Sequence, residues 1–272
     1  MRKIVLGAIL FCVVCAFVLQ RTMSFTERQT SVHRAIGGLM NRVEEAANPT
    51  PKPPDPIVVS PAKAWALAAS GVLTARNGEH HDALNGVPLT PEWAASKSAA
   101  LRNTWDVTNK ASLLEVLGSL RKYGHHVDFE KRGTYVSSLN QAQYNELLER
   151  TRKDPDDLRQ VQLVKERYRR FGKNPVLAWD YVRYLNLCRW GYVAGYLTEA
   201  EAWDLMMPVA RDLQKHFDSW KDVGDSFLFG REYWSYSEMK QTGALYRDAC
   251  ERLLEDPKSP WNKIPWDLNL AE

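Results

Sequence analysis

Cysteine is scarce in this chain of 272 residues, which contains only four. Cys12 and Cys15 lie in an N-terminal apolar run, so Cys188 and Cys250 remain for a folded domain. Two cysteines this far apart match no zinc-ligand spacing and no CxxC redox motif. The sequence favours buried free thiols, since lone cysteines behave as small apolar residues. A Cys188–Cys250 disulfide is the alternative for an exported domain.

A basic excess is also missing outside the N-terminal tail. Residues 1–61 contain seven Lys/Arg residues against four acids, which leaves 29 of each in the rest of the chain. A nucleic-acid-binding domain is expected to be basic, because contacts with phosphates supply most of its non-specific affinity. The charge balance therefore argues against a nucleic-acid partner.

The sequence contains no Gly-rich phosphate loop, nucleophile elbow or paired-carboxylate motif. Gly78–Asp82 and the pair His125-His126 do contain residue types that ligate metals. Neither cluster places two ligands four residues apart on one helix face, so we interpret both as polar residues of loops and helix ends. We therefore predict no metal and no cofactor, and an enzyme is the less favoured class.

One apolar run stands at the amino terminus. Arg2 and Lys3 precede the sixteen uncharged residues 4–19, and this order is typical of membrane targeting. As a helix the run would rise about 24 Å, slightly less than the ~30 Å hydrocarbon core, although Arg21 can extend its side chain to the interface. We predict a signal anchor over residues 1–25.

Cleavage of this segment is the alternative. Small residues at Val14–Ala16 permit a signal-peptidase cut and a secreted protein, and a lipoprotein cut before Cys15 is a further possibility. The positive charges before the run favour a cytoplasmic start and an outward domain, although Arg21, Arg28 and Arg34 weaken that bias.

Proline marks the end of the tail. Five of the nine residues 48–56 are proline, which favours an extended, semi-rigid spacer. We predict a linker over residues 26–61 and a helical domain over residues 62–272.

Helix starts recur through this domain. Four of them pair a capping residue with proline: Ser60-Pro61, Thr90-Pro91, Asp154-Pro155 and Asn174-Pro175. The capping oxygen accepts hydrogen bonds from free amides of the first turn, and proline lacks the amide that would be left over. Capping boxes are predicted at Asn140 and Thr198. Glycines expected as C-terminal caps are Gly78, Gly124, Gly172 and Gly191.

The apolar spacing is also helical, and only Thr134–Ser137 alternates weakly as a strand would. We predict an all-α domain of eight or nine helices. One helix, expected from Pro175 to Trp190, is apolar on most sides and should lie at the domain's centre. A charge in such a helix needs a partner, because removing the partner of a buried charge costs about 3–5 kcal/mol. For Asp180 the candidate cations are Arg183 and Arg231.

Three stretches of this domain carry a family resemblance: ALNGVPLTPEW, NTWDVTNKASLLEVLGSLRKYGHHVDF, and AWDYVRYLNLCRWGYVAGYLTEAEAWDLMMPVARDLQKHFDSWKDVGDSFLFGREYW. Together they resemble the bacterial family catalogued as domain of unknown function 1266, over about residues 73–234. The resemblance implies a helical bacterial domain, and it implies no activity, ligand or catalytic residue. Residues 150–171, which resemble an insertion, and the N-terminal anchor with its proline linker are not assigned to the family pattern.

The candidate functional site is a polar group on and around the central helix. Its predicted members are Asp180, Arg183, Asn186, Arg189, Trp190, Tyr192, Trp203, Arg231 and Trp234. Ligand pockets are mostly apolar with a few convergent polar groups, which this set resembles. The favoured interpretation is a buried network of ion pairs, and a ligand pocket is the alternative.

A second candidate surface is the segment from Arg150 to Lys173, with nine basic residues. We interpret it as a solvated helix face, with a protein partner or an anionic surface as the alternative. The function predicted for the chain is a binding or protein-interaction module, anchored to a bacterial inner membrane by residues 4–19, with its domain outside the cytoplasm. The alternative function is an enzyme of unknown reaction at Asp180, Arg189 and Arg231.

Overall fold

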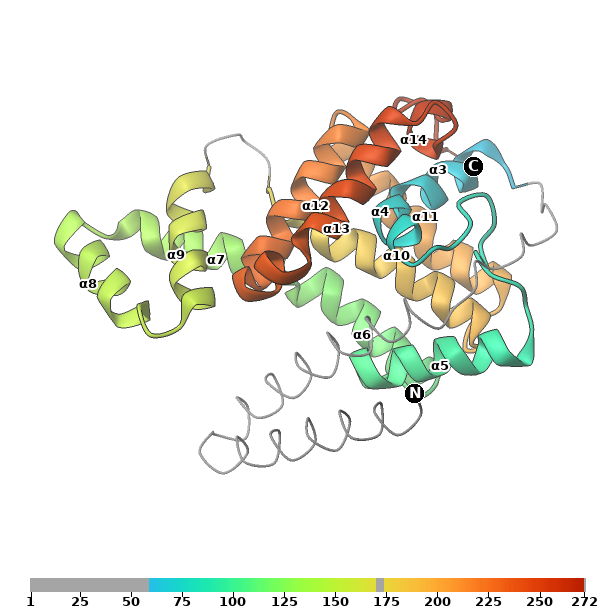
Figure 1. Ribbon diagram of the computed structural model, residues 1–272, viewed down its shortest axis with the longest axis horizontal. Helices are drawn as coiled ribbons and strands as arrows, with labels where there is room; N and C mark the ends of the chain where they lie inside the picture. The colour runs from blue at the N-terminus through green and yellow to red at the C-terminus, as the bar shows by residue number, and fades with distance from the viewer. Residues whose placement is uncertain (1–58, 170–173, 272) are drawn as a thin grey trace, which may run out of the picture. The chain divides into compact units, whose positions relative to one another are not determined.

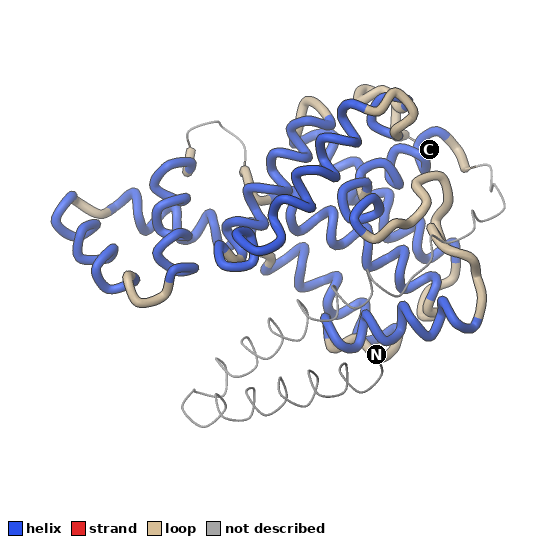
Figure 2. The backbone as a smooth tube through the Cα atoms, in the orientation of Figure 1, coloured by secondary structure: helices blue, strands red, loops and turns tan. Residues whose placement is uncertain are grey.

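The computed structural model describes residues 59–169 and 174–271 (Figure 1). All regular structure in these ranges is helical, and none of it is strand (Figure 2). The helices are α3 Pro61–Ala69, α4 Gly71–Arg76, α5 Pro91–Trp105, α6 Lys110–Tyr123, α7 His125–Ser138, α8 Gln141–Thr151, α9 Pro155–Arg167, α10 Leu177–Val193, α11 Glu199–His216, α12 Trp220–Trp234, α13 Tyr236–Glu255 and α14 Pro260–Lys263. The all-α class is confirmed. The expected count of eight or nine was too low, since ten of these helices have nine or more residues.

The predicted anchor at residues 4–19 and most of the predicted linker lie outside the described residues. Within the described part of the chain, no helix has both the length and the apolar character needed to cross a membrane.

Five of the six helix starts predicted from capping residues are confirmed. The side chains of Ser60, Thr90 and Asp154 accept main-chain hydrogen bonds at the starts of α3, α5 and α9. Capping boxes begin α8 and α11 as expected. The fourth predicted start was wrong: Asn174 Oδ1 accepts from the Val176 N–H at 3.0 Å, which makes a turn before α10 begins at Leu177.

The glycines expected to end helices differ in role. Gly124 ends α6 and at the same time precedes α7, whereas Gly172 lies outside the described residues. Gly191 was assigned wrongly, because it lies inside α10, where a Cβ atom would be 2.4 Å from Leu113 Cδ2. Gly195 follows the end of α10 with a φ of 76°, a conformation that glycine adopts at little cost.

Helix α10 lies at the centre of the fold, as its apolar sequence predicted. Fourteen of its seventeen residues are buried, so no face of the helix is left for solvent. It packs against α3, α4, α6, α7, α11 and α12. Figure 1 shows α12 and α13 side by side, and α12 packs against α10. Truncation of a buried leucine such as Leu185 should therefore cost about 2–5 kcal/mol.

A group of tryptophans joins the C-terminal segment to α3. The Trp65 ring centroid lies 4.7 Å from that of Trp220 and 5.0 Å from that of Trp266. Trp65 Nε1 donates to Trp266 O at 3.0 Å, and Trp261 Nε1 donates to Ala68 O at 2.9 Å. The rings thus bury a large apolar area, and the N–H groups of Trp65 and Trp261 are satisfied by main-chain carbonyl oxygens.

The two cysteines of the domain are free and buried, which excludes the alternative disulfide between them. Burial raises the pKa of Cys250 to about 12 and raises the pKa of Cys188 as well. Both behave as small apolar residues of the core.

Candidate functional site

Asp180 is completely buried, and both of its carboxylate oxygens are occupied. Its Oδ1 accepts hydrogen bonds from Arg183 Nη2 and from His125 Nδ1, the latter at 3.2 Å. Its Oδ2 accepts from His126 Nδ1 at 2.7 Å and from the His126 main-chain N–H at 2.8 Å. Burial by itself would raise the pKa of Asp180, but the histidine hydrogen bonds and the Arg183 charge outweigh it and hold that pKa far below its usual range.

This arrangement makes Asp180 the cap of a different helix. Gly124, the residue before α7, offers no side-chain cap, and the His126 N–H of the first turn donates to Asp180 instead. A Cβ atom at Gly124 would be 2.5 Å from Asp180 Oδ2, so a larger residue would force the α6–α7 corner away from Asp180. A carboxylate at a helix N-terminus is also stabilised by the helix dipole.

The sequence identified only part of this cluster. Arg183 was correctly predicted as a cation for Asp180, but Arg231 was not found to be one. The two histidines were expected at a helix end, where they do lie, and their contact with Asp180 was missed. The available signal was a glycine followed by two donors at a corner, together with a buried acid that needed partners.

Arg189 is also completely buried, and it belongs to a separate cluster. Its guanidinium group has five N–H donors, which meet Leu84 O, Ser70 Oγ, Thr74 Oγ1, His80 O and Ala83 O. None of these acceptors is a carboxylate. Arg189 therefore fastens the segment between α4 and α5 to the central helix, and the role visible in its contacts is structural.

A buried ion pair lies beside this segment. Glu79 Oε1 accepts from Lys97 Nζ at 2.7 Å and from Trp190 Nε1 at 2.8 Å. Lys97 Nζ also lies 4.8 Å from the centroid of the Trp190 ring, a cation–π contact. Trp190 of the predicted site thus contacts Glu79, a residue that sequence reasoning had placed in a polar loop.

Arg231 lies in a third cluster, between α10, α12 and α13. Its Nη2 donates to Thr242 Oγ1, and its Cζ is 4.0 Å from the Tyr246 ring centroid and 5.6 Å from that of Trp234. Trp234 in turn stacks on Trp179 at 5.4 Å. Asp180, Arg189 and Arg231 therefore share no hydrogen bond, and they do not converge on one polar group.

The remaining predicted site residues are dispersed. Asn186 is buried on α10, and Tyr192 is half-buried near the end of the same helix. Trp203, on α11, donates from Nε1 to Glu199 Oε1 at 3.2 Å. Within the described part of the chain, none of these three side chains hydrogen-bonds to Asp180, Arg183, Arg189 or Arg231.

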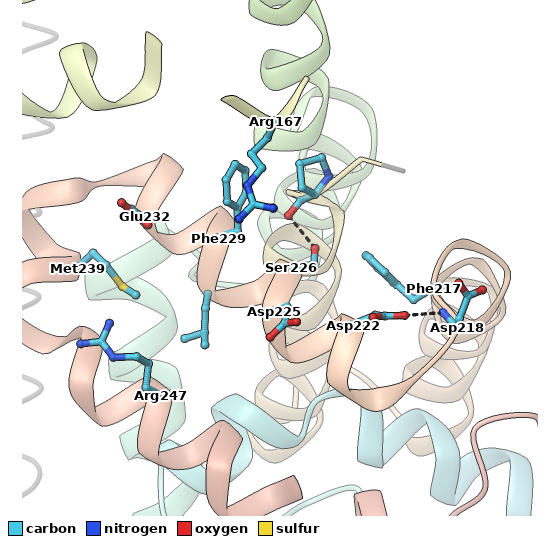
Figure 3. Close-up of a pocket in the computed structure, with 12 residues that line it drawn as sticks. Arg167, Phe217, Asp218, Asp222, Asp225, Ser226, Phe229, Glu232, Met239 and Arg247 are labelled. Carbon is cyan, nitrogen blue, oxygen red and sulfur yellow. Dashed lines mark hydrogen bonds between the residues drawn. The ribbon is translucent and has the colours of Figure 1, made fainter. Parts of the chain in front are cut away.

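Sequence reasoning missed a groove of about 700 Å³, which we call the acidic groove (Figure 3). Its lining residues are Arg167, Pro175, Phe217, Asp218, Asp222, Asp225, Ser226, Leu228, Phe229, Glu232, Met239 and Arg247. Six of these twelve residues come from α12, where polar and apolar residues recur at intervals of three and four. That spacing was the signal available in the sequence.

Charge in the acidic groove is mostly negative. Four carboxylates and two guanidinium groups line it. Asp225 pairs with Lys221 at 2.6 Å, and Glu232 pairs with Arg159 at 2.8 Å. Ser226 donates to Pro175 O at 2.9 Å and so is occupied by the fold. Figure 3 shows Arg167 next to Phe229 at one end, and the Arg167 Cζ is 5.7 Å from that ring's centroid.

Metal ligation has no visible centre in the described ranges, where no three His, Cys, Asp or Glu side chains come together as a metal ion would require. The histidines nearest to a carboxylate, His125 and His126, use their Nδ1 atoms for Asp180.

The domain matches the family model described as "Protein of unknown function (DUF1266)" over residues 100–266. The chain belongs to this family. The match contains the Asp180 cluster, Arg189 and the acidic groove. The bounds of the match also span residues 150–171.

Two proteins of Escherichia coli K12, both described as uncharacterised, are similar to this DUF1266 chain. YbeU is 24% identical over 184 residues, which cover 62% of this chain and 77% of YbeU. YbeR is 30% identical over 67 residues, which cover 25% of this chain and 28% of YbeR. No solved structure matches the chain.

Proposed function

We propose that this DUF1266 domain is a binding module that receives a basic, amphipathic segment of a partner protein in the acidic groove. The observation that carries the proposal is the groove itself, which combines an apolar lining with an excess of carboxylates. Its volume of about 700 Å³ lies within the usual range of ligand sites.

The apolar part of the groove suits one or two aliphatic or aromatic side chains. Leu228, Phe229 and Met239 contribute to it, and methionine adapts its flexible side chain to different shapes. The three residues are half-buried, so each still has apolar surface to lose on binding. Such burial contributes roughly 25 cal/mol per Å².

The charged part suits lysine or arginine next to those apolar side chains. Asp225 has a side chain that is 62% exposed and is paired with Lys221, whose side chain is also exposed. A surface ion pair of this kind contributes about 0–1 kcal/mol, so an incoming cation can replace it at little cost. The order of residues in the partner would then be that of an amphipathic helix laid into a groove.

Membrane attachment is part of the same proposal. Residues 4–19 are the proposed anchor, the proline-rich linker is the spacer, and the domain would work outside the cytoplasm at a bacterial inner membrane. The basic segment from Arg150 to Lys173 is the second surface that such a module would present, either to a protein or to an anionic membrane.

An enzymatic function has one observation in its favour. His126 Nδ1 lies 2.7 Å from the ionised Asp180, which orients the imidazole as the acid of a His–Asp pair orients a general base. The tautomer with hydrogen on Nδ1 would leave His126 Nε2 to accept a proton. Nitrogen NMR of the imidazole tests this, since hydrogen on Nε2 with bare Nδ1 would exclude the role.

The binding proposal is tested by fluorescence anisotropy with a labelled peptide of arginine and leucine in which the leucines recur at intervals of three and four, so that a helix carries them on one face. The full chain is held in phosphatidylcholine nanodiscs, and empty nanodiscs correct for binding to lipid. The same peptide with glutamate in place of arginine serves as the opposite-charge probe. We expect saturable binding of the arginine peptide that weakens with salt.

Two matched variants localise the binding. Asp225→Lys changes the groove, whereas Asp248→Lys makes the same charge change at an exposed residue of α13 that does not line it. Asp225→Lys should weaken binding on the order of tenfold, and Asp248→Lys by less than about twofold. Equal weakening by both variants, or equal binding of both peptides, would show that the groove is not the site.

A further inference from the structure

Three guanidinium groups gather around the aromatic residues where α4, α10, α12 and α13 meet. Arg231 Cζ lies 4.0 Å from the Tyr246 ring centroid and 6.0 Å from the Trp179 ring centroid. Arg183 Cζ lies 4.2 Å from the Trp179 ring, and Arg76 Cζ lies 5.6 Å from the Tyr246 ring. None of these residues lines the acidic groove.

Two N–H donors of this cluster have no acceptor among the described residues. They are Arg231 Nε and Trp179 Nε1, and both are buried. Arg231 is 5% exposed and Trp179 is 4% exposed, so bulk water has little access to these side chains. A buried donor left unsatisfied costs about 1–3 kcal/mol. Because both atoms are donors, the group that would satisfy them is an acceptor.

The nearby carboxylates do not fill this role. Asp180 is held by Arg183 and the two histidines. Burial lowers the pKa of Arg231, and the negative charge of Glu238 raises it. The effect of burial is the larger, so the pKa of Arg231 is lowered overall.

We propose that the Arg231 cluster is a binding site for a small oxyanion, a phosphate or a carboxylate group, held by Arg231 and Trp179 with Arg183 and Arg76 beside them. The guanidinium edge formed by Nε and an Nη atom matches the two oxygens of such a group. The surrounding rings keep water away and so strengthen the attraction. Arg183, Arg76, Thr242 and Trp234 are half-buried, so the edge of the cluster reaches solvent.

This site differs from the acidic groove in the sign of the charge that it selects. The groove would take a cation, whereas the Arg231 cluster would take an anion. The two proposals therefore stand or fall separately.

The test titrates the full chain, in dodecyl maltoside, with inorganic phosphate and separately with acetate, while sodium chloride keeps the ionic strength constant. Tryptophan fluorescence is the readout, because Trp179 and Trp234 lie against Arg231. We expect a saturable change with at least one of the two anions. Saturation by phosphate assigns a phosphate group, and saturation by acetate assigns a carboxylate.

Variants connect the signal to the cluster. Arg231→Gln should weaken anion binding on the order of tenfold or more, because a charge-assisted pair is lost. Trp179→Phe keeps a ring and removes the N–H, so it should weaken binding several-fold, and it decides the matter if Arg231→Gln does not fold. Arg121→Gln, an exposed arginine paired with Asp212, is the control and should bind as the wild type does.

Two results would overturn the proposal. One is a linear response to both anions without saturation in the wild type, which a general salt effect on the protein surface would produce. The other is an unchanged affinity in Trp179→Phe together with equal weakening in Arg231→Gln and Arg121→Gln.

Discussion

Asp180 of α10 caps α7 through His126: one carboxylate oxygen accepts the His126 main-chain N–H at 2.8 Å and its ring Nδ1 at 2.7 Å. The central helix and the α6–α7 corner are thereby joined through a side chain that is completely buried. Arg183 supplies the balancing charge from the next turn of the same helix. The acid that looked most like a catalytic group thus has both of its oxygens committed to the fold.

Replacement of Asp180 by asparagine should be strongly destabilising. The shape is kept, but Arg183 loses its anion in a buried setting, and removal of one partner of such a pair costs about 3–5 kcal/mol. Urea unfolding measures the loss. Asp212→Asn is the matched control, because its pair with Arg121 is exposed and contributes about 0–1 kcal/mol. Similar small losses in both variants would contradict the structural role of Asp180.

The free energy of unfolding should also decrease as the pH falls, because the buried His81 resists protonation in the folded protein. Burial, followed by the charge of Arg189, lowers the pKa of His81 from 6.5 to about 4. The unfolded chain therefore binds the proton first, and the stabilisation is complete above about pH 6.5 and declines as the pH falls toward about 4. At about pH 5 the loss of unfolding free energy, relative to neutral pH, is about 2 kcal/mol.

Urea unfolding at about pH 7.5 and about pH 5 tests this by comparing the wild type with His81→Asn, which cannot take up the proton. The variant should lose less stability over this interval than the wild type does. The same loss in both proteins would mean that His81 is not the responsible group.

The contacts of Arg189 predict that alanine will have opposite effects on stability at two glycines, Gly86 and Gly118. Gly86 has a φ of 60°, and a Cβ atom there would lie 2.4 Å from Arg189 Nη2. Gly86→Ala should therefore destabilise the protein by at least about 2 kcal/mol. Alanine is strained at this positive φ, and its Cβ atom would displace the buried guanidinium group of Arg189 from its hydrogen bonds. Gly118→Ala, in α6 with nothing within 4 Å of the added atom, should stabilise by up to about 1 kcal/mol. Thermal unfolding distinguishes the two signs, and equal effects would count against the Arg189 contacts.

Cys188 and Cys250 should resist alkylation in the folded protein. The thiolate is the reactive form, and burial raises the pKa of both thiols, to about 12 for Cys250. Iodoacetamide at about pH 8, followed by peptide mass spectrometry, should leave both unmodified until guanidinium unfolds the chain. Rapid alkylation of the folded protein, or recovery of a disulfide-linked peptide, would refute the buried-thiol description.

The fold was predictable where its causes are local. Ser60, Thr90 and Asp154 act within one helical turn, so the sequence alone located the starts of α3, α5 and α9. The two shortest helices, α4 with six residues and α14 with four, are too short to show a periodic pattern, and they account for only part of the undercount. Asn174 resembled a helix cap but makes a turn, because its side chain bonds the amide two residues later.

The candidate site was predictable only where its partners are close in sequence. Arg183 is three residues from Asp180 on one helix, and this neighbour was identified. His126 is 54 residues away and meets Asp180 because two helices cross at Gly124, which no spacing rule reveals. Arg189 and Arg231 were expected near Asp180, but they leave their helices in other directions and reach different acceptors.

The acidic groove escaped notice for a related reason. Its carboxylates resemble an ordinary solvated helix face in the sequence, and the packing of α12 against α13 adds Met239 to the apolar residues of α12 that lie among them. A surface charge acquires functional meaning from what lies beside it, and this is a property of the tertiary structure.

The most direct measurement is methyl NMR of the full chain, labelled at the methionine methyl groups, during titration with the arginine–leucine peptide. Met239 lines the acidic groove, whereas Met206 is completely buried on α11 and serves as the internal control. Binding in the groove predicts a saturable shift of the Met239 methyl signal, absent in Asp225→Lys, with Met206 unchanged. A Met239 signal that stays in place while the peptide binds would contradict the proposed function.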